Sequence, residues 1–410
     1  MTPLQTDLVL PSISLATRLN RVQEPQTIRM AKLGRELRAQ GAAIIDLSLG
    51  EPDFRTPGFI CDAAVEAMEQ GYTKYTPVAG IPELRQAVCT KLKRDNGLDY
   101  SPEEVIISTG AKQSLANAVL CLVNPGDEVI IPTPFWVTYG ALVTLAEGTP
   151  VYLSCGIEDH FKLTPERLEA AITPKTKLFI FSSPCNPTGT VYSRGELAGL
   201  AEVFARYPHV AIISDEIYEY INYAGGHESI AQFEGLRERV LVVNGLSKGF
   251  AMTGWRLGYL AGPKHIVQAC ERFQGQFTSG ANSITQRAAI VALTSDLSAT
   301  QEMVAAFQER RDFVIESLQA MPGLKVAVPD GAFYAFPDVS AFFGSTTPNG
   351  DVIKNDEDLA MYLLHGANVS TVAGSAFGAE KCIRISYATS MDLLQSAMSR
   401  IAKALAELKR

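Results

Sequence analysis

The sequence lacks the features that mark several large classes of protein. No apolar run approaches the ~20 residues that a membrane-spanning helix needs. The N-terminus has no basic flank followed by an apolar core, so a secretory signal is not expected. The net charge of −8 is spread along 410 residues rather than massed, which argues against a nucleic-acid-binding surface. We therefore expect a soluble, cytoplasmic protein with neither a membrane nor a nucleic acid as partner.

Histidine and cysteine are few, and neither is grouped. The five His have no metal-ligand spacing, so no metal site is expected. The seven Cys form no CxxC pair and no disulfide-rich pattern, and several lie in apolar contexts. This usage predicts free core thiols in a reducing compartment. No GxGxxG follows a predicted strand, so a nicotinamide-dependent enzyme is not supported either.

The sequence is long, and predicted buried strands alternate with predicted helices along much of it. A chain of 410 residues is long enough for two or three domains with substantial cores. The alternation predicts an α/β class with a mostly parallel sheet. The expected strands are Ile44–Leu49, Val105–Thr109, Glu128–Ile131, Leu178–Phe181, Val210–Ser214, Val240–Val243 and Leu257–Ala261. From about Met303, a charged helix and shorter elements predict a smaller α+β domain, in which the polar stretch Ser340–Asp356 is expected to be an exposed loop.

The most informative stretch is Val240 to Gly262, VLVVNGLSKGFAMTGWRLGYLAG, which places Lys248 between two apolar strands. Burial disfavours the ammonium form of lysine, and a neutral amine is what a Schiff base requires. Lys248 on an exposed turn is the alternative. Arg256 favours the first interpretation, because a lysine that binds an aldehyde and an arginine that binds its phosphate together describe a pocket for pyridoxal phosphate (PLP).

Three other positions suggest partners for such a group. Gly110-Ala111-Lys112-Gln113 is a small-residue turn from a strand into a helix, which forms an anion site. Asp215 ends an apolar strand and needs a partner such as a pyridinium nitrogen, although it could instead cap a helix. Arg384 lies between Ile383 and Ile385 and suits a carboxylate, although a salt bridge on an exposed strand is also possible.

These motifs, in this order, resemble class I/II PLP-dependent aminotransferases over about the whole chain, in the subgroup of bacterial aspartate and aspartate/prephenate aminotransferases. Lys248, Gly254, Arg256 and Gly258 match the PLP-lysine signature, with Gly245 where many relatives have Ser. The other matching stretches are LGEPDF at Gly50, KYTP at Tyr75, GAKQ at Gly110, SPCNPTG at Asn186, DEIY at Asp215 and RISYA at Arg384.

The resemblance implies a fold-type I PLP-transferase: a mostly parallel sheet sandwiched by helices, with a smaller α+β domain. Residues 1–45 would form an N-terminal arm and a helix packed with the small domain. Residues 46–300 would form the large PLP-binding domain, and residues 301–410 the small domain. It also implies a homodimer with shared active sites, in which Tyr75 hydrogen-bonds the phosphate of the partner's cofactor.

The resemblance also assigns roles to individual residues. It implies Lys248, Asp215 and Tyr218 as catalytic. The residues expected to bind the cofactor are Tyr75, Gly110, Ala111, Lys112, Trp136, Asn186, Asp215, Tyr218, Ser247, Lys248 and Arg256. Those expected to bind the substrate are Gly50, Lys112, Trp136, Asn186 and Arg384. Lys112 would hold the distal carboxylate of aspartate or glutamate, with a purely phosphate-binding role as the alternative.

The implied activity is transamination between an amino acid, with aspartate preferred, and 2-oxoglutarate, by a ping-pong mechanism. Some relatives accept prephenate and carry a lysine before the first helix, where this chain has Gln23, which argues against prephenate use. The alternatives among enzymes are an aminotransferase with a different substrate range (prephenate, aromatic or alanine) and a PLP-dependent carbon–sulfur lyase. A PLP-binding regulator would need a DNA-binding module before Gly50, where only an arm and one helix fit.

Overall fold

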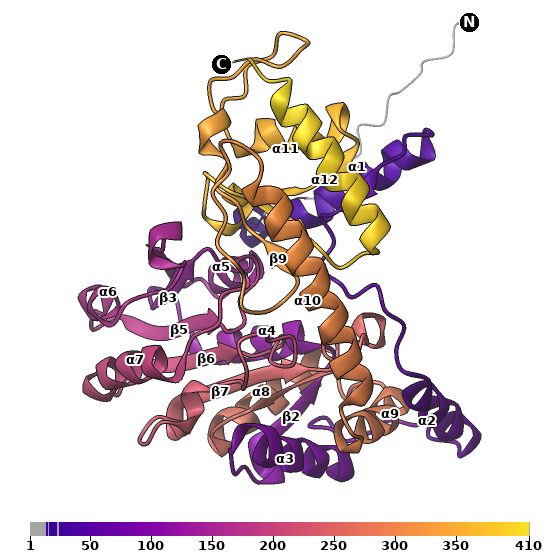
Figure 1. Cartoon of the computed structure of the whole chain (residues 1–410). Helices are drawn as coiled ribbons and strands as arrows, with labels where there is room; N and C mark the ends of the chain where they lie inside the picture. The colour runs from indigo at the N-terminus through magenta and orange to yellow at the C-terminus, as the bar shows by residue number, and fades with distance from the viewer. Residues whose placement is uncertain (1–13, 15, 23, 410) are drawn as a thin grey trace, which may run out of the picture.

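The computed structural model describes residue 14 and residues 16–22 and 24–409 (Figure 1). Most of the expected N-terminal arm, and Gln23, lie outside these residues. The described chain forms a large part around a seven-stranded sheet, and a smaller part above it in Figure 1, where the C-terminal segments gather with α1.

The large sheet has the strand order β2-β8-β7-β6-β5-β3-β4. Neighbouring strands are parallel except for β8, which is antiparallel to both β2 and β7. This confirms the predicted α/β class with a mostly parallel sheet. The strands are β2 (Val105–Ser108), β3 (Glu128–Thr133), β4 (Thr149–Ser154), β5 (Thr176–Ser182), β6 (Ala211–Asp215), β7 (Val240–Gly245) and β8 (Gly258–Ala261). Strand β4 was not predicted, because this edge strand is half exposed and has no continuous apolar run.

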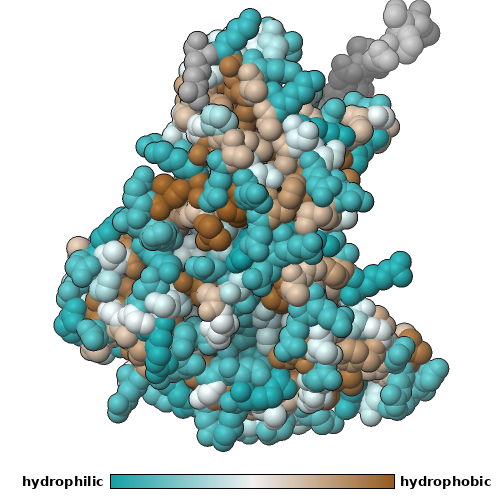
Figure 2. Space-filling view, in the orientation of Figure 1, coloured by the Kyte–Doolittle hydropathy of each residue, from teal (hydrophilic) through white to brown (hydrophobic). Residues whose placement is uncertain are grey.

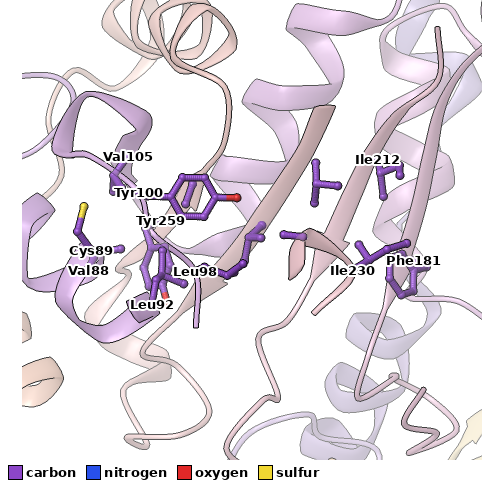
Figure 3. Close-up of a cluster of buried hydrophobic side chains, with 14 of the residues drawn as sticks. Val88, Cys89, Leu92, Leu98, Tyr100, Val105, Phe181, Ile212, Ile230 and Tyr259 are labelled. Atoms are coloured by element: carbon purple, nitrogen blue, oxygen red, sulfur yellow. The ribbon is translucent and has the colours of Figure 1, made fainter. Parts of the chain in front are cut away.

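Helices cover both faces of this sheet. One face packs against α4 (Ala111–Leu122), α5 (Thr138–Leu145) and α8 (Lys264–Phe277). The other packs against α3 (Pro82–Asn96), α6 (Pro165–Ala171), α7 (Arg194–Arg206) and α9 (Ser283–Thr294), with α2 (Gly58–Glu69) beside α9. Figure 3 shows this second core, where Val88 and Leu92 of α3 approach Val105 and Tyr259 of the sheet.

The smaller part combines the start and the end of the chain. Strand β1 (Ile45–Asp46) pairs in parallel with β10 (Val369–Ser370), and a second sheet has the order β11-β12-β9. Its strands are β9 (Tyr334–Ala335), β11 (Val372–Ala373) and β12 (Ile383–Ser386). Its helices are α1 (Gln26–Ala39), α10 (Ser298–Gln319), α11 (Asp356–Gly366) and α12 (Met391–Ala406). Helix α1 joins it through a small core of Met30, Ile44 and Leu364.

Two segments differ from their sequence-based expectations. Helix α10 begins five residues before Met303, where Asp296 accepts hydrogen bonds from the backbone N–H and the hydroxyl of Ser298. The stretch Ser340–Asp356 is not exposed throughout, because the side chains of Phe342 and Ile353 are buried in the core of the small part. The polar composition of this stretch led to the prediction of an exposed loop, although these two apolar residues anchor it in the core.

The surface in Figure 2 is mostly hydrophilic, with hydrophobic residues gathered at mid-height, where the upper and lower parts meet. Among the described residues, no helix is both long and apolar enough to cross a membrane.

Candidate active site

A cavity of about 430 Å³ lies beyond the carboxyl ends of the central strands, between the large and the small part. In open α/β sheets this end is where ligands bind. Eleven of the residues predicted from the sequence line the cavity: Gly50, Ala111, Lys112, Trp136, Asn186, Asp215, Tyr218, Ser247, Lys248, Arg256 and Arg384. The structure therefore brings together residues that are up to 334 positions apart in the sequence.

Lys248 follows strand β7 and its amine is enclosed in the cavity. Nζ donates a hydrogen bond to the carbonyl oxygen of Gly50. Burial lowers the pKa of Lys248 to about 8, and the positive charges of Arg384 and Arg256 act in the same direction. A lysine with this pKa loses its proton readily near neutral pH, so it can attack an aldehyde carbonyl.

Asp215 ends strand β6 and is only 3% exposed. Burial raises the pKa of this carboxyl to about 6. Its Oδ2 accepts a 2.7 Å hydrogen bond from the hydroxyl of Tyr139, and its Oδ1 accepts one of 3.3 Å from the backbone N–H of Ile217. No ion pair to Asp215 occurs within the described residues, so this buried carboxylate suits a cationic ligand group such as a protonated ring nitrogen.

The opposite charge gathers near the start of α4. Gly110 precedes this helix with φ +81°, and a Cβ there would lie 2.6 Å from Nη2 of Arg256. Arg256 itself has φ +54°, a left-handed conformation that costs a non-glycine residue energy and is concentrated at functional sites. Nη1 of Arg256 donates to the carbonyl of Thr253 at 2.9 Å. A guanidinium beside the free N–H groups of a helix N-terminus fits a phosphate.

Lys112 lies next to this anion site and also faces an aromatic ring. Its Nζ is 4.8 Å from the ring centroid of Trp136. Partial burial lowers the pKa of Lys112, and the charge of Arg256 lowers it further. The amine is therefore close enough to Arg256 to feel its charge, and it also lines the open part of the cavity.

Arg384 is almost fully buried, with 2% exposure, on strand β12. Nη1 donates to Oδ1 of Asn186 at 3.0 Å and Nη2 to the carbonyl of Ser48 at 2.5 Å, while Nε has no hydrogen-bond partner among the described residues. The guanidinium carbon lies 4.6 Å from the ring centroid of Tyr334. The prediction that Arg384 could be an exposed strand residue in a salt bridge does not hold, and an unpaired N–H at the cavity wall suits a carboxylate.

Two tyrosines and a glycine complete the wall near Lys248. The hydroxyls of Tyr218 and Tyr334 share a 2.7 Å hydrogen bond, and burial raises the pKa of both. A Cβ at Gly50 would lie 2.8 Å from the Tyr334 hydroxyl, so this position leaves no room for a side chain.

Two predicted residues do not line the cavity. Gly110 adjoins it through its contact with Arg256. Tyr75 is 99% exposed and is not among the residues that line the cavity. The sequence analysis also missed lining residues, namely Tyr139, Tyr334, Ser48, Ser182 and one face of α1 formed by Thr27, Ile28, Ala31 and Arg35. The spacing of the four α1 residues on one helical face was the signal available for them.

Outside the cavity, the described residues include one group of possible metal ligands, formed by Glu216, Glu219 and His227. Nε2 of His227 lies 2.9 Å from Glu216, and Glu219 forms a buried ion pair with Lys91. Each carboxylate already has a partner, whereas Nδ1 of His227 is buried without one among the described residues.

Comparison with known proteins shows the family to which this chain belongs. The family profile described as "Aminotransferase class I and II" matches residues 42–401. The chain belongs to the class I and II aminotransferase family. It is an aminotransferase of the EC 2.6.1 type and depends on pyridoxal phosphate.

Individual relatives of this aminotransferase span nearly its full length. It is 49% identical over 393 residues to the aspartate/prephenate aminotransferase of Cereibacter sphaeroides, covering 94% of this chain and 97% of that one. It is 48% identical over 409 residues to a bifunctional aspartate aminotransferase and glutamate/aspartate-prephenate aminotransferase of Petunia hybrida, covering 98% and 85%.

The fold agrees with solved structures of the family. The aspartate aminotransferase of Rhizobium meliloti superimposes with a TM-score of 0.94 at 43% identity, covering 97% of this chain and 100% of that one. The aspartate aminotransferase of Thermus thermophilus with maleate gives a TM-score of 0.90 at 40% identity, covering 96% and 100%.

Proposed function

We propose that this aminotransferase transfers the amino group of L-aspartate to 2-oxoglutarate by a ping-pong mechanism. The observation that carries the proposal is the charge distribution in the cavity. Beyond the arginine suited to the phosphate, the cavity has Arg384 for an α-carboxylate and Lys112 for a second, distal carboxylate. The names of the relatives, which are aspartate aminotransferases and aspartate/prephenate aminotransferases, support aspartate as the amino donor.

The residues present fit pyridoxal phosphate. Arg256 and the start of α4 would hold its phosphate, with Ser247 beside Lys248. Asp215 would pair with its ring nitrogen, Trp136 would lie on the ring, and Asn186 and Tyr218 would contact the phenolic oxygen. When bound, the cofactor supplies an aldehyde that captures the amino group and a ring that accepts electrons from the substrate Cα.

The chain's own residues would then perform the remaining work. Arg384 orients the substrate through its α-carboxylate. Nζ of Lys248, with a pKa of about 8, takes the proton from the substrate Cα and returns it on the cofactor side. Asp215 keeps a negative charge at the ring nitrogen, which favours the protonated ring throughout the reaction.

We further propose that the active unit is a homodimer. Tyr75 lies midway along the loop between α2 and α3 with its side chain in solvent, and a side chain so placed can enter a neighbouring subunit. Exposed Phe59, Val65, Met68 and Phe277 provide apolar area for such an interface. The division into residues 1–45, 46–300 and 301–410 remains our proposal. The pairing of β1 with β10 supports the assignment of the N-terminal segment to the small part.

The decisive experiment follows half-reactions of the holoenzyme with single donors, monitored by the cofactor absorption. Aspartate should react faster than alanine, phenylalanine or glutamine, with oxaloacetate as the product. The 2-oxoglutarate acceptor should then restore the starting spectrum, whereas prephenate should do so poorly. Release of ammonia, pyruvate and a thiol from a donor with a carbon–sulfur bond, such as cystathionine, would instead indicate a carbon–sulfur lyase. A preference for alanine or an aromatic donor would overturn the substrate assignment.

A further inference from the structure

Asp46 lies outside the cavity, yet it is connected to one of the cavity's arginines. It ends strand β1, and its side chain is only 7% exposed. Its Oδ1 accepts two hydrogen bonds from Ser48, one from the backbone N–H at 3.0 Å and one from the hydroxyl at 2.6 Å. Its position is fixed by the sheet, because Asp46 is in register with Ser370 of β10. This carboxylate therefore holds both the main chain and the side chain of Ser48.

Ser48 in turn contacts Arg384. The carbonyl of Ser48 accepts the 2.5 Å hydrogen bond from Nη2, which is one of two hydrogen bonds that the described structure gives this guanidinium. The other acceptor is Oδ1 of Asn186, at the opposite edge of the guanidinium. These two acceptors set the orientation of the Arg384 guanidinium. If the Ser48 carbonyl became mobile, one edge of the guanidinium would no longer be held in place.

The other oxygen of Asp46 faces α1. Its Oδ2 lies 3.4 Å from Nη2 of Arg38, near the C-terminal end of that helix. One turn before it, Arg35 belongs to the α1 face that lines the cavity. A single buried carboxylate thus connects the helix that forms one wall of the cavity to the arginine proposed to bind the substrate.

We propose that Asp46 is a positioning residue for substrate binding. Through Ser48 it orients Arg384 toward the α-carboxylate, and through Arg38 it couples the orientation of Arg384 to the position of helix α1. This inference rests on the proposed role of Arg384. It assigns Asp46 an effect common to every amino acid and 2-oxo acid, because all of these substrates carry the α-carboxylate. An effect on a distal carboxylate would be confined to dicarboxylic substrates.

The test compares holoenzyme variants with aspartate, alanine and 2-oxoglutarate. Asp46→Asn keeps the shape and removes the charge, and Asp46→Ala also removes both acceptors. Each should raise KM for all three substrates, by about three- to tenfold as expected for one weakened hydrogen bond, with the larger increase for Ala. The kcat should stay within about twofold and cofactor retention should not change. Arg38→Ala should raise KM less, because that side chain is partly exposed.

Arg29→Ala is the matched control, because Arg29 is an exposed arginine on the same helix that does not line the cavity. It should leave KM unchanged. Thermal unfolding of each variant shows whether Asp46 acts only on stability, and Asp46→Asn provides a folded variant if Asp46→Ala does not fold.

Unchanged KM values in folded Asp46 variants would overturn the inference. If Arg384→Lys still raised KM for every substrate, the proposed function would stand and only the inference about Asp46 would fail. If Arg384→Lys also left KM unchanged, the assignment of Arg384 would fail and the inference with it. A fall in kcat without a change in KM would likewise contradict a positioning role.

Discussion

The hydroxyl of Tyr139 donates a 2.7 Å hydrogen bond to Oδ2 of Asp215 in the fully buried floor of the cavity. This bond stabilises the ionised carboxylate against a burial effect that raises the pKa of Asp215 to about 6. Tyr139 therefore helps to keep Asp215 charged at neutral pH, as a partner for a cationic ring nitrogen requires.

Replacing Tyr139 with Phe should raise the pKa of Asp215. Cofactor affinity requires the ionised carboxylate, so affinity should fall as pH decreases through about 6 in the unaltered protein. In Tyr139→Phe this fall should begin about one to two pH units higher, since a hydrogen bond to a charged group contributes ~1.5–3 kcal/mol. PLP binding measured over about two pH units on either side of neutrality would check this. Identical profiles would show that Tyr139 does not control this ionisation.

Lys248→Ala should lose transamination by roughly 100- to 10,000-fold, the usual contribution of a positioned acid–base group. The fold should remain, because the Lys248 amine lines the cavity and donates one hydrogen bond, to the Gly50 carbonyl, within the described residues. Thermal unfolding provides the control for folding. Borohydride reduction of the holoenzyme followed by peptide mapping identifies the lysine that carries the cofactor, and a label on Lys112 or any other lysine would contradict the assignment.

Arg256→Ala should weaken cofactor retention more than substrate binding. One charge-assisted phosphate contact contributes about 1.5–3 kcal/mol, or roughly one to two orders of magnitude in PLP affinity. Arg287, which is partly buried, pairs with Glu83 and lies outside the cavity, is suitable for a control variant. Equal PLP affinity in Arg256→Ala and the unaltered enzyme would place the phosphate elsewhere.

Tyr75 should act across a subunit interface. Mixing Tyr75→Ala with Lys248→Ala under conditions that exchange subunits should restore activity, up to about a quarter of the unaltered level for a symmetric dimer, because each mixed dimer has one intact site. Each variant incubated alone is the control. Absence of recovery after demonstrated subunit exchange would show that Tyr75 does not serve the partner's site.

Lys112→Ala should lower kcat/KM for aspartate about ten- to a hundredfold and affect alanine far less, because only aspartate has a second carboxylate. Its proximity to Arg256 supports the competing role on the phosphate. Equal losses for aspartate and alanine, together with weaker PLP retention, would assign Lys112 to the cofactor.

The sequence by itself determined the fold class and most of the cavity. Strands such as Val240–Val243 are buried on both faces, so they appear as continuous apolar runs, and a chemically unusual residue beside them is conspicuous. Lys248, Asp215 and Arg384 could be singled out for this reason, and the order of the motifs indicated the aminotransferase family that the comparisons confirm.

Tertiary structure alone decided which residues support those groups. Tyr139, Tyr334 and Asp46 are ordinary by composition, and their significance depends on contacts with residues 50 to 338 positions away in the chain: Tyr139 with Asp215, Tyr334 with Arg384, and Asp46 through Ser48 with Arg384. The same is true of β4, whose half-exposed edge has no apolar run, and of Phe342 and Ile353, which are buried within a polar stretch. Local sequence patterns record which faces are apolar, whereas the pairing of buried polar groups depends on how distant segments pack together.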